Sequence, residues 1–173
     1  MKKLLLFLSL ITINVIVTPL SLLTGAGAKP GIKGVIFDVN GVLVHRSGPQ
    51  KDYVIDKAMI RLVDSLRSKG IKTYILSNMS NRTYDALSKA NQLFNHFDGV
   101  ICSVNVGVAK PEKESFLKVC ELYNLDPATC IFIDDTPGHV AAAKNLGMHG
   151  IEFTSASDCV KQLQMLIPNL QLS

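Results

Sequence analysis

The chain has 173 residues, about the length of one domain. Hydrophobic residues make up 47% of it and charged residues only 18%, which excludes a disordered or charge-driven protein. The net charge is +4, but two of the 18 basic residues, Lys2 and Lys3, belong to an N-terminal leader. Subtracting these two leaves 16 basic residues against 14 acidic ones, and no nucleic-acid partner is expected from so small an excess.

Residues 1–28 have the pattern of a secretory signal peptide. Two lysines precede a mostly apolar segment, residues 4–17, and small residues follow, ending in Ala26-Gly27-Ala28. A basic start, an apolar middle and an A-x-A end are typical of a cleaved leader. The alternative is a retained N-terminal membrane anchor, because residues 4–23 are just long enough to cross a bilayer. Under either interpretation residues 29–173 form the functional domain and are exported, as a periplasmic or secreted protein or one held by its N-terminal segment.

The cysteines are interpreted as small buried hydrophobic residues. None is spaced as C-x-x-C, and four in a chain of this length are too few for a disulfide scaffold. They fall in predicted strands or on helix faces: Cys102, Cys120, Cys130 and Cys159. Because an exported protein is exposed to oxidising conditions, disulfide formation stays open as an alternative.

Strands and helices are predicted to alternate along the functional domain. Buried apolar runs predict strands over 34–37, 72–76, 99–103, 130–134 and 149–153. The helical spacing of apolar residues predicts helices over 54–66, 81–93, 113–123, 140–146 and 157–167, the second capped by Asn81 or Thr83. This alternation predicts an α/β fold with a doubly wound parallel sheet, which binds ligands at the carboxyl ends of its strands.

Polar side chains stand at several of these carboxyl ends. Asp38 follows the first strand and Ser77 the second. Asp134-Asp135 lies at the end of the fourth, and Lys110 follows the third after a loop. A single Asp after a strand is usually a helix cap, but four such positions in order indicate a functional site.

These side-chain types are suited to phosphoryl transfer. Three carboxylates repel one another unless a cation lies between them, and hard oxygen ligands at an open site favour Mg²⁺. Ser77 and Lys110 are then expected to hold phosphate oxygens, where charge accumulates in the transition state. An Asp can serve as the attacking nucleophile, because an aspartyl-phosphate is readily hydrolysed.

Four segments resemble the four ordered motifs of the haloacid dehalogenase-like (HAD) hydrolase superfamily, a Rossmann-like fold. They are VIFDVNGVLV (35–44), YILSN (74–78), GVAKPEKESF (107–116) and FIDDTPGHVAAAKNLGM (132–148). The resemblance implies that Asp38 is the nucleophile, Ser77 the hydroxyl of the second motif and Lys110 the lysine of the third.

The resemblance also implies a metal site and a substrate class. Asp134 and Asp135 match the acidic pair that binds Mg²⁺ together with Asp38 and the backbone carbonyl of Asn40. The implied substrate-binding residues are Gly41, Ser77, Asn78 and Lys110. The Leu-Ser-Asn and Asp-Asp-x-x-x-x-Val patterns are similar to the sugar-phosphatase-like branch, and the paired acids favour phosphate over halide.

Position 40 departs from the phosphatase pattern Asp-x-Asp, because this chain has Asp38-Val39-Asn40. The second Asp protonates the leaving oxygen, and an Asn can hydrogen-bond there but cannot move a proton. General acid–base catalysis contributes roughly 10²–10⁴-fold in rate. The sequence therefore predicts a slow phosphatase that prefers esters whose leaving group departs without help.

The chain also lacks room for the cap domain that many HAD hydrolases insert. Only residues 43–71, expected to be mostly one helix, separate the first two motifs, and only 104–109 precede Lys110. The site is therefore expected to be open. An open site suits a phosphorylated macromolecule, or a small phosphate in an oligomer whose neighbouring subunit covers it.

A rival interpretation, from a different class of protein, is a non-catalytic binding protein that uses the same residues to hold phosphate groups or a partner.

The histidines are expected in solvent or helix-capping roles, because they do not have the spacing of metal ligands. They are His45, His96, His139 and His149.

Overall fold

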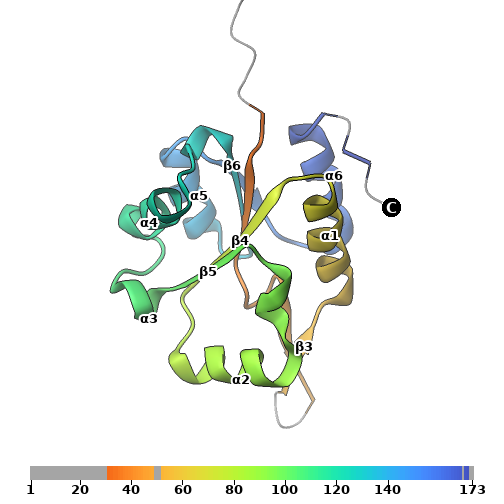
Figure 1. Cartoon of the computed structure of the whole chain (residues 1–173), viewed down its shortest axis with the longest axis vertical. Coiled ribbons are helices and arrows are strands. Elements are labelled where there is room, and N and C mark those ends of the chain that lie inside the picture. The colour runs from red at the N-terminus through yellow and green to blue at the C-terminus, as the bar shows by residue number, and fades with distance from the viewer. Residues whose placement is uncertain (1–30, 49–51, 169, 172–173) are drawn as a thin grey trace, which may run out of the picture.

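The computed structural model describes residues 31–48, 52–168 and 170–171, in which a five-stranded sheet lies between two layers of helices (Figure 1). The strand order is β5-β4-β1-β6-β7, and every neighbouring pair is parallel. The strands are β1 (Gly34–Phe37), β4 (Lys72–Ser77), β5 (Gly99–Cys102), β6 (Cys130–Asp134) and β7 (His149–Glu152). The predicted α/β doubly wound sheet is confirmed, with each strand within one residue of its predicted bounds.

The two faces of the sheet bury different side chains. Val35 and Phe37 of β1 face one hydrophobic cluster, and Ile36 between them faces the other, as the alternation of a strand requires. Helices α1 (Lys57–Ser68) and α6 (Ala156–Leu166) cover the first face. Helices α4 (Lys113–Tyr123) and α5 (Pro137–Asn145) cover the second. Each fully buried Phe or Ile contributes about 1.5–3 kcal/mol, and this packing holds the ends of the strands in place.

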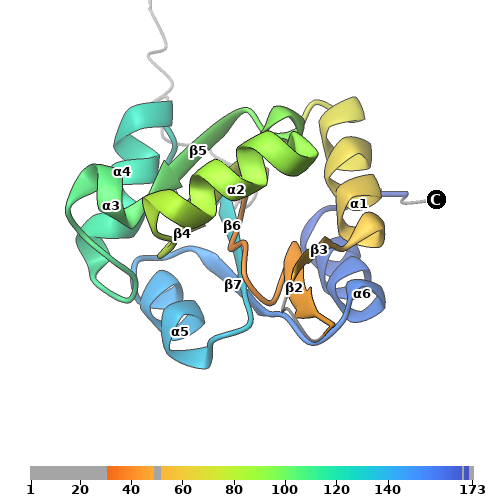
Figure 2. The ribbon, with the colours of Figure 1, turned by 90° about the horizontal axis from the view of Figure 1, so that it is seen from below.

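Two further helices flank the carboxyl ends of the strands (Figure 2). Helix α2 (Asn81–Asn91) follows β4, and the one-turn helix α3 (Ser103–Val106) follows β5. The described residues also contain two short 3-10 helices, η2 (Leu93–His96) and η3 (Pro127–Thr129).

A β-hairpin corrects the prediction of one helix over residues 54–66. Strand β2 (Val44–Ser47) pairs antiparallel with β3 (Asp52–Ile55). The helix begins only at Lys57, because the carboxylate of Asp56 accepts hydrogen bonds from the first turn, at 2.8 and 3.1 Å. The apolar residues just before this cap therefore belong to a strand, although their spacing continues that of the helix.

The N-cap of helix α2 is Ser80, which precedes both predicted capping positions. The hydroxyl of Ser80 caps it by accepting a hydrogen bond from the Thr83 backbone N–H at 3.3 Å. The predicted caps, Asn81 and Thr83, lie within the first turn instead. A serine in extended conformation meets the geometry that an N-cap requires.

The four cysteines are all buried, as predicted, and all are free. The described residues contain no separate cap domain; they form the α/β unit and the hairpin. Within this part of the chain no helix combines the length and apolar character needed to cross a bilayer. The predicted leader, residues 1–28, lies outside the described residues.

Candidate active site

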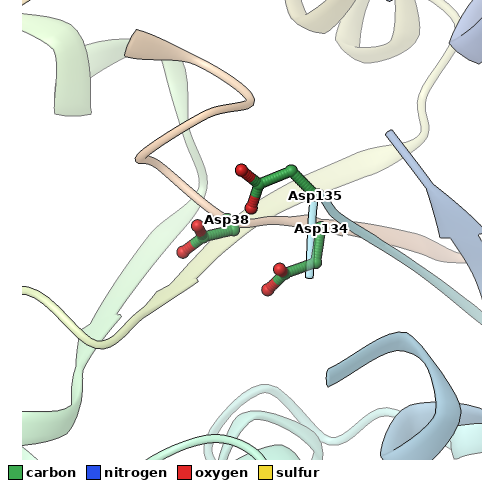
Figure 3. Close-up of side chains that lie close together, drawn as sticks. All are labelled: Asp38, Asp134 and Asp135. Carbon is green, nitrogen blue, oxygen red and sulfur yellow. The ribbon is translucent and has the colours of Figure 1, made fainter. Parts of the chain in front are cut away.

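Three carboxylates meet at the centre of the sheet's carboxyl edge (Figure 3). Asp38 directly follows β1, Asp134 ends β6, and Asp135 is the next residue. Because β1 and β6 are adjacent and parallel, their ends lie side by side. One oxygen from each carboxylate lies within 4.8 Å of the others. The predicted convergence of Asp38 with the acidic pair is therefore present.

Lys110 lies between two of these carboxylates. Its Nζ donates to Asp38 Oδ1 at 2.8 Å and to Asp134 Oδ2 at 2.5 Å. The lysine side chain is 1% exposed, Asp134 is fully buried and Asp38 is 10% exposed. Two buried carboxylates thus share one ammonium, while Asp135 remains exposed.

Asn78 holds the backbone of Lys110. Its Oδ1 accepts from the Lys110 N–H at 2.9 Å, and its Nδ2 donates to the Lys110 carbonyl at 2.8 Å. The resemblance implied a substrate-binding role for Asn78, and this pair of hydrogen bonds adds a positioning role that sequence reasoning missed. The amide fixes the loop that delivers the lysine ammonium to the carboxylates.

Ser77 carries the one buried side-chain polar atom without a hydrogen-bond partner among the described residues. It ends β4, next to β1, and is 1% exposed. A buried hydroxyl left unpaired costs about 1–3 kcal/mol, so such atoms usually have a function or a ligand. Its place at the end of β4 is the one predicted for a hydroxyl that contacts phosphate.

Burial raises the pKa of Asp38 above its ordinary value of 3.8, and neighbouring Asp134 adds to the rise, although Lys110 opposes it. The ionised carboxylate is therefore costly when no further cation is present. Two buried carboxylates, an exposed one and a single ammonium form a donor set with spare negative charge. Such a set of hard oxygen atoms fits a divalent cation such as Mg²⁺.

Gly41 allows the loop after β1 to pass close to Asp135. Its φ is +85°, and a Cβ at this position would collide with the Asp135 carboxylate. Only glycine adopts this conformation without strain and leaves room for the carboxylate. Asn40, the preceding residue, is exposed beside the carboxylates.

The comparison with family models decides the family. The model described as haloacid dehalogenase-like hydrolase matches residues 47–147, more than half of the chain. The chain belongs to the haloacid dehalogenase-like hydrolases.

Curated HAD relatives include named phosphatases. A flavin mononucleotide hydrolase of Arabidopsis thaliana is 30% identical over 82% of this chain and 56% of that protein. A sesquiterpene phosphatase of Aspergillus oryzae is 28% identical over 65% of this chain and 57% of that protein. The chain thus spans little more than half the length of these relatives.

Solved HAD structures share the fold. A HAD family enzyme of Bacteroides thetaiotaomicron has a TM-score of 0.69 and 19% identity, over 78% of this chain and 99% of that one. The same enzyme in complex with magnesium and inorganic phosphate has a TM-score of 0.66 and 19% identity, over 72% and 95%. An uncharacterised protein of Corynebacterium glutamicum has a TM-score of 0.65 and 26% identity, over 79% and 95%.

His139 is a member of the HAD site that the sequence prediction missed. Its Nδ1 lies 3.1 and 3.0 Å from the two oxygens of Asp134, instead of serving only as a cap or facing solvent. The residue stands in the first turn of α5, five positions after Asp134, so the turn between them folds it back. The five-residue spacing between Asp134 and His139 within the fourth motif was the sequence signal that could have predicted this contact.

The hairpin gives the HAD site a wall. A cavity of about 480 Å³ lies between the loop after β1, the hairpin and the start of α2, and Asn40, Gly41 and Asn78 line its inner side. Residues 43–71 were predicted to be mostly one helix that leaves the site uncovered. This prediction is corrected, because β2 and β3 form a two-stranded hairpin that borders the site.

Proposed function

We propose that this HAD hydrolase is a Mg²⁺-dependent phosphate monoester hydrolase in which Asp38 forms an aspartyl-phosphate. One observation carries the proposal: three carboxylates gather at the end of β1, two of them bound to Lys110, close to the unpaired buried hydroxyl of Ser77. Two relatives, the sesquiterpene phosphatase and the flavin mononucleotide hydrolase, support the same reaction class.

Asp38, Asp134 and Asp135, with the backbone carbonyl of Asn40, are proposed to hold the metal. Mg²⁺ bound there would supply positive charge that neutralises both the carboxylates and the phosphate. The donor chemistry of the three acids supports this assignment.

The chain's own residues are proposed to carry the reaction in two steps. The Asp38 carboxylate attacks phosphorus, the bond between phosphorus and the ester oxygen breaks, and the leaving oxygen departs with the bonding electrons and takes its proton from water. Water then cleaves the aspartyl-phosphate and regenerates Asp38. Lys110 Nζ, already 2.8 Å from Asp38, and the Ser77 hydroxyl would contact phosphoryl oxygens as their charge grows.

Asn40 is proposed to slow this reaction. Its amide can donate a hydrogen bond to the leaving oxygen but carries no proton to transfer. Esters of acidic alcohols, such as aryl phosphates, should therefore be better substrates than alkyl phosphates.

The same asparagine favours a second candidate function, a phosphate-binding protein without turnover. Ser77, Lys110 and the metal ligands would serve such a protein equally well. Turnover and binding separate the two functions.

The test measures phosphate release from an aryl phosphate by the full chain, with Mg²⁺ and with a chelator. Turnover that needs Mg²⁺ and is lost in Asp38→Asn is the expected result. Asp85→Asn, an exposed carboxylate on α2, is the matched control and should keep the native rate. Stabilisation by phosphate without turnover would support the binding protein and contradict hydrolysis.

Export through residues 1–28 remains a proposal of its own. A leader of this kind would place the hydrolase outside the cytoplasm, where it acts on a phosphorylated macromolecule or a small phosphate ester. Fractionation of cells expressing the full chain, with and without residues 1–28, tests this directly. Equal retention of both forms in the cytoplasm would contradict export.

A further inference from the structure

The cavity beside the carboxylates has a positive lining. Arg46 of β2 supplies the positive charge, and among the described residues no carboxylate lines the cavity. The volume, about 480 Å³, lies within the range of small-molecule sites. Asn40 lines it too, so the cavity begins where the leaving group of a phosphate bound at Asp38 would emerge.

Arg46 is held in place by a contact network that spans the cavity. Its Nη2 donates to the Tyr53 hydroxyl at 2.6 Å, and its guanidinium carbon lies 4.7 Å from the centre of the Tyr53 ring. The same hydroxyl lies 3.2 Å from Thr83 Oγ1 in the first turn of α2. The network joins both strands of the hairpin to α2 and fixes the direction of the guanidinium.

Arg46 has no carboxylate partner among the described residues, and neither has Arg82. Arg82 lines an adjoining cavity of about 460 Å³, which shares four lining residues with the first: Arg46, Tyr53, Ser80 and Thr83. One acid, Asp52, lines this outer cavity and is exposed. Positive charge therefore dominates the space next to the reaction centre, and the acid lies only in the outer part.

We propose that this cavity binds the leaving group of the substrate and that Arg46 binds a second anionic group on it. The substrates would be phosphate monoesters of alcohols that carry a carboxylate or another phosphate. A guanidinium forms paired, charge-assisted hydrogen bonds with both anions. The placing of the leaving group rests on the proposed function, because it assumes that phosphate binds at Asp38.

The first test compares matched substrates. Phosphate esters of short ω-hydroxy acids of increasing length are compared with the corresponding amides, which have the same shape and no negative charge. The native chain should prefer the acids in kcat/KM, and the best length reports the distance to Arg46. Arg46→Gln should lower kcat/KM for the acids about 10- to 100-fold and change that for the amides within about twofold.

Two further variants separate charge from folding. Arg46→Lys keeps the charge and should restore part of the preference for acids. Arg61→Gln removes an exposed arginine of α1 that does not line the cavity, and it should behave as the native chain does. Alkanediol bisphosphates compared with their monophosphates identify whether phosphate or carboxylate is the better second anion.

A binding measurement keeps this inference separate from the proposed function. In Asp38→Asn, calorimetry of the acid and amide esters reports affinity without turnover. If no ester is hydrolysed but the acids bind more tightly through Arg46, hydrolysis fails and the anion site stands. Equal use and binding of acids and amides, or equal losses of both in Arg46→Gln, would overturn the anion site even in an active hydrolase.

Discussion

The two sides of the site are built in opposite ways. The floor (Asp38, Lys110 and Asp134) consists of buried charges held by parallel strands of the central sheet. The wall (Arg46, Tyr53 and Thr83) consists of exposed or half-buried side chains on a hairpin and a helix start. The floor matches the motifs of the HAD family, whereas the wall lies outside those motifs, on the hairpin and the first turn of α2.

This difference predicts how each side responds to substitution. Removing one partner of a buried ion pair costs about 3–5 kcal/mol, because the other charge is left unpaired. Exposed polar contacts contribute only about 0–1 kcal/mol. Changes in the floor should therefore alter both chemistry and stability, and changes in the wall should alter selectivity with little effect on stability.

The largest effect is expected for Asp38→Asn. Loss of the nucleophile should reduce kcat by on the order of 10⁴-fold or more. The metal-free variant should nevertheless have a higher Tm than the native chain at neutral pH, since burial raises the pKa of Asp38 and makes its ionised form costly, whereas Lys110 keeps Asp134 as its partner. Calorimetry in chelator compares the two. A lower Tm in the variant would show that the Lys110 pair outweighs the burial of the carboxylate.

The difference in stability between the native chain and Asp38→Asn should depend on pH. A carboxyl group whose pKa is raised by folding destabilises the protein in its ionised form. The native chain should therefore lose stability relative to Asp38→Asn as the pH rises from the ordinary value of 3.8 through the raised pKa, and keep a constant difference above it. A difference in Tm that stays unchanged across this range would contradict the raised pKa.

Lys110→Met should damage chemistry and stability together. Loss of one charge-stabilising donor lowers kcat about 10²- to 10³-fold. In chelator, leaving Asp38 and Asp134 without their ammonium should lower the free energy of unfolding by about 3–5 kcal/mol. Urea unfolding with and without Mg²⁺ measures this, and Mg²⁺ should stabilise the variant more than the native chain.

A matched control for Lys110→Met is available on α4. Lys113 has a side chain that is 68% exposed, and Lys113→Met should leave both rate and stability near native values. If the two lysine variants unfold at the same urea concentration, the buried ion pair contributes nothing measurable and the distinction between floor and wall fails.

The floor could be predicted from the sequence because its signals are local and strong. Each acid follows an uninterrupted apolar run, and parallel strands bring their carboxyl ends together whatever the loops do. Lys110 was found through its motif, although its contacts with Asp38 and Asp134 depend on Asn78, which is 32 residues away in the chain.

The wall could not be predicted in the same way. Val54 and Ile55 continue the spacing of the following helix, and only the cap at Asp56 separates them from it. The antiparallel pairing of β2 with β3 is a tertiary contact, which the periodicity of apolar residues does not report. The contact between His139 and Asp134 was also missed, because a histidine in the first turn of a helix has several possible hydrogen-bond partners.

Asn40→Asp tests whether the floor lacks only a proton carrier. The variant should hydrolyse alkyl phosphates about 10²-fold faster, and aryl phosphates much less so, because an aryl leaving group needs no proton. The ratio of the two kcat/KM values is the measurement. Because Asn40-Gly41 is prone to deamidation, intact mass and peptide mapping must show an unmodified Asn40 in the native sample. No gain on either ester class would contradict the role assigned to position 40.

The smallest effect is expected from Tyr53→Phe in the wall. The substitution removes the hydroxyl that joins Arg46 to Thr83 and leaves the ring in place. Since the contact is half exposed, the free energy of unfolding should fall by only about 0–1 kcal/mol. The preference for acid over amide esters should fall severalfold, by less than in Arg46→Gln, because the guanidinium remains but is less well held.

Tyr84→Phe is the matched control for this last change. Tyr84 stands next to Thr83 on α2 and stacks on Phe94, away from Arg46, so removal of its hydroxyl should leave the preference for acids unchanged. A preference that survives Tyr53→Phe intact would mean that Arg46 needs no anchor. An equal loss in Tyr84→Phe would mean that α2, and not the hairpin contact, sets selectivity. The first result would reduce the wall to Arg46 alone, and the second would place selectivity on α2.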